Sequence, residues 1–179
     1  MNPAPVTPVR VWDAVVRLFH WSLVVCFAAN ALVTNPETAL HHYIGYTVLG
    51  LVALRLVWGL IGTRHARFSD FLPSFHGALQ QLCDMATGRR HVHVGHSPLG
   101  ALMIYNLLAT LLVIGASGYA QTTLTFFGVK WVKEVHEVAV TWAEISIALH
   151  VMAVIGESRR LGVNLARAMV TGVKEIPRE

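Results

Sequence analysis

The chain has 179 residues, of which 54% are hydrophobic and only 13% are charged, and its formal net charge is +4. A soluble domain carries about 25% charged residues, so this composition excludes an ordinary soluble protein and predicts an integral membrane protein. The two cysteines, Cys26 and Cys83, lie far apart and outside any C-x-x-C-H motif. They therefore indicate neither a disulfide framework nor covalently attached haem.

The expected fold is all-α: one domain over residues 1–179, built as a four-helix bundle in the membrane. Long runs almost free of charged residues predict the spans. These spans cover about residues 18–36, 41–62, 99–120 and 136–156.

Short polar segments flank the spans. Residues 1–9 are rich in proline and predicted to be a loose tail, and Asp13 follows as a candidate N-cap of the first span. In the segment 63–97, apolar residues recur at helical spacing, which predicts an additional amphipathic helix lying on the membrane surface. They are Phe75, Leu79, Leu82 and Met85. The C-terminal tail, residues 157–179, is basic and amphipathic, and we expect it at the surface too.

Lysine and arginine gather on one side of this arrangement. Residues 1–17 hold two, residues 63–97 four and residues 157–179 five, whereas the opposite side holds only Lys130 and Lys133. Basic residues mark the cytoplasmic side, so both termini are predicted to be cytoplasmic, in a bacterial inner membrane. The positive charge is thus a topology signal, and no nucleic-acid partner is expected.

Four histidines form two pairs by depth in this topology. His136 and His150 are 14 positions apart on the fourth span, which places both within about 40° of one face and about 21 Å apart in height. His20 starts the first span near the cytoplasmic face, and His41 starts the second near the outer face. His20 with His150, and His41 with His136, could each clamp one haem iron from two sides. Filled axial positions leave no site for oxygen on the metal, so electron transfer is expected.

Several ordered motifs make the chain similar to the bacterial cytochrome b561 and nickel–iron-hydrogenase cytochrome b group of four-helix dihaem membrane proteins. These motifs are Val11-Trp12-Asp13, Arg17-Leu18-Phe19-His20-Trp21, His41-x-x-x-Gly45, Arg55-Leu56, Gly95-His96-Ser97-Pro98-Leu99-Gly100, His136-Glu137, His150, Glu157-Ser158-Arg159 and Met169-x-Thr171-Gly172-x-Lys174. The resemblance implies two non-covalent b-type haems on His20, His41, His136 and His150 and electron exchange with membrane quinone, either ubiquinone or menaquinone. His41 is preferred over its neighbour His42 because it matches the spacing of the group.

The outer redox partner stays open at this level. One candidate is a periplasmic c-type cytochrome or another oxidoreductase subunit, for which the chain would be a relay or the membrane anchor of a hydrogenase-like enzyme. The other is superoxide, oxidised while quinone is reduced, which would make the chain an enzyme. A positive patch at Lys130, Trp131 and Lys133 could attract an anion or an acidic protein, although interfacial anchoring explains these residues as well.

Three charged residues near the predicted haems each have more than one interpretation. Arg17 and Arg55 are candidate haem-binding residues through a propionate, but they could equally be a cytoplasmic anchor and a snorkelling side chain. Glu144 lies mid-span between the two histidines of the fourth helix. It could pair with Arg55, carry protons for quinone chemistry, or be a protonated acid hydrogen-bonded in the bundle. His96, which opens the third span, could touch a propionate or quinone or be a boundary residue.

Overall fold

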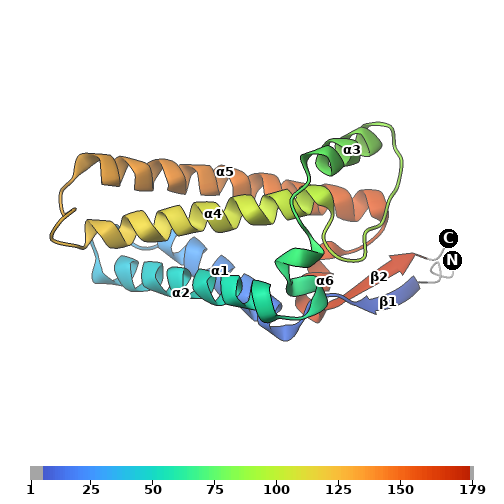
Figure 1. The fold of residues 1–179 in the computed structure, drawn as a ribbon, viewed down its shortest axis with the longest axis horizontal. Coiled ribbons are helices and arrows are strands. Elements are labelled where there is room, and N and C mark those ends of the chain that lie inside the picture. Colours follow the sequence, from blue (N-terminus) through green and yellow to red (C-terminus); the bar gives the residue numbers. More distant parts are fainter. Residues whose placement is uncertain (1–5, 178–179) are drawn as a thin grey trace. The chain divides into compact units, whose positions relative to one another are not determined.

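A computed structural model describes residues 6–177 of the chain (Figure 1). Helices make up most of it, and four are long and apolar enough to cross a membrane. In chain order the helices are α1 (Ala14–Leu32), α2 (Ala39–Ile61), α3 (Phe75–Ala86), α4 (Pro98–Gln121), α5 (Lys130–Leu161) and α6 (Leu165–Thr171). Two single-turn 3-10 helices, Arg64–Ala66 and Phe68–Asp70, follow α2.

The long helices α1, α2, α4 and α5 confirm the expected membrane helical bundle. Their bounds differ from the predicted spans mainly at α1, which begins and ends four residues earlier, and at α5, which begins six residues earlier and continues five residues further. Hydropathy marks only the apolar part of a helix. Charged turns extend α5 at both ends with the same helical hydrogen bonding, so hydropathy did not predict them.

By internal packing the chain divides into two compact units. The terminal unit contains Met1–Arg17, Trp58–Tyr105 and Ala148–Glu179, and the histidine unit contains Leu18–Val57 and Asn106–Ile147. Each long helix contributes one part to each unit.

In the terminal unit, two strands that the sequence did not reveal lie antiparallel, β1 (Val6–Arg10) and β2 (Val173–Pro177) (Figure 1). The expectation of a loose tail over residues 1–9 is therefore wrong for residues 6–9. Gly172 makes the approach to β2 possible: its φ is +82°, and its carbonyl accepts hydrogen bonds from the amides of Val11 and Trp12. A Cβ at Gly172 would lie 2.6 Å from the Trp12 carbonyl oxygen, so only glycine fits.

Asp13 caps α1, as predicted. Its Oδ1 accepts a hydrogen bond from the Val16 amide at 2.8 Å, and its Oδ2 accepts from Trp58 Nε1 at 3.0 Å and Thr63 Oγ1 at 2.6 Å. Burial alone would raise the pKa of Asp13, but these hydrogen bonds stabilise the ionised form and hold its pKa below the ordinary value. The cap therefore fixes the start of α1 against the end of α2 and the turn that follows it.

The surface helix α3 is amphipathic, as predicted. Ser74 caps it by accepting from the Gly77 amide, and Phe75, Leu79 and Leu82 are exposed along one side. On the opposite side Gln81 is buried and bonds both to the Leu99 amide and to Glu157. An exposed apolar stripe backed by a polar anchor suits a helix at a lipid interface.

The predicted surface tail is more ordered than expected, because α6 and β2 fold against the rest of the terminal unit. Lys174 in β2 is only 5% exposed and donates from Nζ to the His93 carbonyl. Burial lowers the pKa of Lys174, and the negative charge of Glu157 partly opposes that shift.

Candidate haem site

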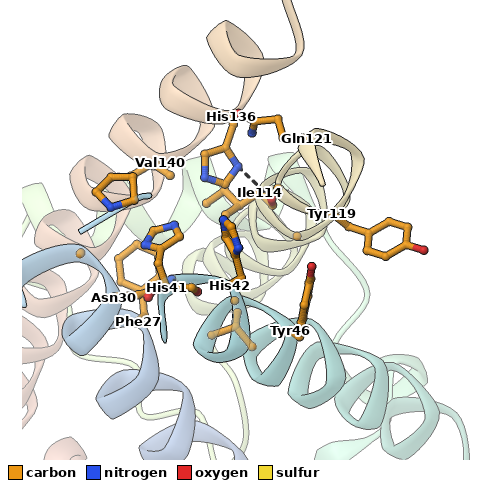
Figure 2. Close-up of a pocket in the computed structure, with 16 residues that line it drawn as sticks. Phe27, Asn30, His41, His42, Tyr46, Ile114, Tyr119, Gln121, His136 and Val140 are labelled. Atoms are coloured by element: carbon orange, nitrogen blue, oxygen red, sulfur yellow. Dashed lines mark hydrogen bonds between the residues drawn. The ribbon is translucent and has the colours of Figure 1, made fainter. Parts of the chain in front are cut away.

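Within the histidine unit, one pocket lies among α1, α2, α4 and α5 (Figure 2). The imidazoles of His41, from α2, and His136, from α5, both face this pocket (Figure 2). Its lining is largely apolar and aromatic and includes Phe27, Ala31, Tyr46, Val48, Ile114, Gly115, Gly118, Tyr119 and Val140. The structure thus brings together the two histidines that the sequence placed at the outer level.

The His136 ring is held by α4. Its Nδ1 lies 3.1 Å from the Ile114 carbonyl oxygen and 3.1 Å from Ser117 Oγ, and Figure 2 marks the first contact. The Ser117 hydroxyl donates its proton to the Val113 carbonyl at 2.6 Å, so both atoms near Nδ1 act as acceptors. Nδ1 must therefore carry the proton, which leaves Nε2 of a neutral His136 with a free lone pair.

The His41 ring is held by Thr34, which lies just after the end of α1. Its Nδ1 lies 3.1 Å from Thr34 Oγ1, and its backbone carbonyl accepts from Asn30 Nδ2 at 3.2 Å. His42 also lines the pocket but is exposed, and among residues 6–177 its ring makes no hydrogen bond to the protein. Metal-ligating histidines usually hydrogen-bond through the second ring nitrogen, so the contacts favour His41.

Gly118 gives His136 its room. A Cβ at Gly118 would lie 3.1 Å from Cε1 and 3.4 Å from Nδ1 of His136. Glycine here lets the ring lie directly against α4. Glycine at this position therefore helps to set where the His136 ring lies in the pocket.

The other two predicted ligands lie in different units, His20 in the histidine unit and His150 in the terminal unit, and each is partly exposed. Their pairing stays a prediction.

In the terminal unit, the His96 ring centroid lies 4.5 Å from that of Trp12 and 4.1 Å from that of Phe71. Aromatic packing thus accounts for the position of His96.

The two arginines have different surroundings. Arg55 is 4% exposed, which favours an interior role over snorkelling to the surface. Arg17 donates from Nη1 to the Val170 carbonyl at 2.6 Å and from Nε to the Asp13 carbonyl at 3.4 Å. These bonds give Arg17 a structural role in joining α1 to α6, and its contact with a propionate stays a prediction.

Glu144 lies on the exposed surface of α5 and makes no ion pair among the described residues. No salt bridge joins Glu144 to Arg55 among the described residues, so the first of the three interpretations of Glu144 gains no support. Further polar contacts between α4 and α5 in this unit are made by Asn106, which donates to Ser146 Oγ at 2.9 Å and accepts from Trp142 Nε1 at 3.0 Å.

The basic residues at the start of α5 are paired with acidic neighbours. Lys130 lies 3.6 Å from Glu134, and Lys133 lies 3.7 Å from Glu137. These four charges cancel, so the expected positive patch is offset on the helix itself. An attraction for superoxide or for an acidic protein therefore gains no support here.

The sequence reasoning missed Asn30, Thr34 and Ser117, which hold the candidate ligands. Asn30 and Thr34 had a signal, since they are polar residues four apart at the end of an apolar run. Ser117 had none, because a single serine in a span most often bonds its own helix.

Taken together, these observations define a multi-span membrane helical bundle with two histidines facing a pocket between its helices. A model of the prokaryotic cytochrome b561 family matches residues 11–172. The chain belongs to this family, and it is therefore a prokaryotic multi-pass membrane protein of b-type haem electron transfer. Comparison with curated proteins and with solved structures gave no match.

The residues of the pocket fit a haem. Two imidazoles face it from different helices, both rings are hydrogen-bonded through Nδ1, and Gly118 lets the His136 ring pack against α4. The donor set, two neutral nitrogens in an apolar lining, is the one that b-type haem takes for electron transfer.

Proposed function

We propose that the chain carries electrons across the membrane through two b-type haems, each held by two histidines. His41 and His136 hold the outer haem and His20 and His150 the inner one, within a single domain. The observation that carries the proposal is the hydrogen bonding of His41 and His136, because both rings present Nε2 as the available nitrogen on one pocket.

The protein's own contribution is to hold the haem by its histidines and to shield it from water. Helix α2 supplies an imidazole that bonds to Thr34, just after α1, and α5 supplies one that bonds to α4, so hydrogen bonds orient both rings. Phe27, Ile114 and Val140 contribute an apolar lining that excludes water. When bound, haem would supply a one-electron couple, and two imidazoles on its iron would leave no coordination site for oxygen.

Buried Arg55 is proposed to hold a propionate of the inner haem, and Arg17 is a further candidate for the same task. The burial of Arg55 supports its role, since a side chain that snorkelled to the interface would be exposed. Both residues lie toward the side that carries most of the lysines and arginines.

We further propose that the electrons pass between quinone, either ubiquinone or menaquinone, and a protein partner outside the membrane, such as a periplasmic c-type cytochrome or oxidoreductase subunit. The concentration of lysine and arginine near both termini and in residues 63–97 supports an orientation with both termini in the cytoplasm. The outer histidine pair then lies at the periplasmic side, where such a partner docks.

The test is haem quantified in the purified protein, together with reduced-minus-oxidised spectra. We expect two haems b per chain, and one haem after single substitution of His20, His41, His136 or His150 by Ala. The matched control is His42→Ala, next to a proposed ligand, which keeps both haems. Full haem content in the His41→Ala or His136→Ala protein would contradict the proposal. Reduction by added quinol, in vesicles that contain the wild-type protein, tests the quinone step separately.

A further inference from the structure

A short hydrogen-bond chain joins the end of α1 to the start of α2. Thr34 Oγ1 lies 2.9 Å from the Asn30 backbone carbonyl oxygen, 2.9 Å from Asn30 Oδ1 and 3.1 Å from His41 Nδ1. Asn30 Nδ2 in turn donates to the His41 backbone carbonyl at 3.2 Å. Asn30 thus contacts both the Thr34 side chain, which touches the His41 ring, and the backbone of His41 itself.

The direction of each proton follows from these distances. The His41 carbonyl can only accept, so the Asn30 amide nitrogen must face it, and Oδ1 must face Thr34. Thr34 then has two acceptor oxygens of Asn30 at 2.9 Å and a single hydroxyl proton to offer. That proton points to Asn30, and the lone pairs of Thr34 Oγ1 are left to accept a proton from His41 Nδ1.

We infer that Thr34, fixed by Asn30, is a positioning residue: it holds His41 in the Nδ1-protonated form and so assigns Nε2 to the outer haem. The inference rests on the proposed function. It goes beyond ligand identity, because it names what selects His41 over the adjacent, exposed His42. A hydrogen bond from Nδ1 also makes an imidazole a stronger donor to its metal, so Thr34 lowers the reduction potential of that haem.

Thr34→Val removes the hydroxyl and keeps the shape, and Thr34→Ala does so without a branched side chain in case the valine protein does not fold. Thr47→Val is the matched control: Thr47 is also a threonine bonded to a carbonyl four residues before it, that of Tyr43 at 2.9 Å, and it is exposed on α2. Thr34→Ser restores the hydroxyl and is the rescue variant.

The readouts are haem content and a potentiometric titration that resolves the two haems. In the Thr34→Val or Thr34→Ala protein we expect the potential of one haem to rise and that of the other to stay. A tenfold change in the preference for the oxidised state corresponds to a shift of about 59 mV in the potential for one electron. We also expect the same haem to be retained more weakly, by about tenfold or more. Thr34→Ser restores both values, and Thr47→Val changes neither.

Potentials and haem retention in both Thr34 variants equal to those of Thr47→Val would overturn the inference. So would an equal change in both haems, or a Thr34→Ser protein that behaves like Thr34→Val. If His41→Ala keeps both haems, the proposed function itself fails. If His41→Ala loses one haem while the Thr34 variants match the control, only the role of Thr34 is wrong.

Discussion

Gly118 offers the sharpest test of the pocket, because its substitution by alanine changes one methyl group beside His136. The new Cβ would lie 3.1 Å from Cε1 of the ring, compared with about 3.5–4.0 Å for a relaxed carbon contact. The ring therefore has to move by roughly half an ångström. That movement strains the two 3.1 Å contacts of Nδ1 with Ile114 and Ser117.

The effect on haem binding comes from overpacking, which costs about 1–3 kcal/mol. Alanine in place of glycine also stabilises a helix by about 0.5–1 kcal/mol, but this gain is the same in the loaded and the unloaded protein and so leaves haem affinity unchanged. The cost falls mainly on the loaded protein, since the ring of the unloaded protein can rotate away. We expect a net loss of about 1.4 kcal/mol in haem binding at the outer site, which is about tenfold in affinity.

The assay is the transfer of haem from the purified protein to an excess of apomyoglobin, with the spectrum of each haem followed over time. Gly50→Ala is the matched control, because Gly50 lies in α2 and a Cβ there meets no atom within 4 Å. One haem of the Gly118→Ala protein should transfer faster than in Gly50→Ala, with the second unchanged. Equal transfer from both variants would refute the assignment of His136 to a packed haem pocket.

Three further outcomes concern the frame around the pocket. Asp13→Ala should lower the free energy of unfolding by about 2–3 kcal/mol, because it removes one helix cap and two side-chain hydrogen bonds. The folded state lowers the pKa of Asp13. In a thermal-unfolding series, the difference from wild type is therefore complete above about pH 4 and disappears as the pH falls through the pKa of Asp13 in the folded state. Gly172→Ala should expose the β1–β2 pair to protease, and cleavage no faster than in wild type would contradict the need for a positive φ. Ser146→Ala leaves Asn106 without its acceptor at 2.9 Å, so the unfolding temperature of the purified protein should fall by an amount that corresponds to about 1–2 kcal/mol; no fall would mean that water satisfies Asn106.

The membrane helices could be predicted from the sequence because the lipid sets one strong rule, that an apolar run must satisfy its own backbone hydrogen bonds. Depth followed from the same rule, so His41 and His136 were expected at one level, and both line one pocket. The ends of α5 could not be predicted this way, since its first and last turns are charged and leave no mark in hydropathy.

What the sequence could not show is how side chains share protons. His41 and His42 differ by one position, and what distinguishes their rings is the contact of His41 with Thr34 and the greater exposure of His42. The strands were missed for a similar reason: β1 is five residues long, contains Pro8, and has its partner far along the chain. Such a segment looks like a loop until its distant partner is known.

The pairing of β1 with β2 sets the order of assembly during synthesis. Arg10 leaves the ribosome 163 positions before its partner Val173, so all four long helices are made while β1 is still single. Until Gly172 emerges, the amides of Val11 and Trp12 lack their acceptor. Closure of this pair thus waits until β2 has been made, and a chain stopped before residue 172 would present an open strand to the cell's proteases.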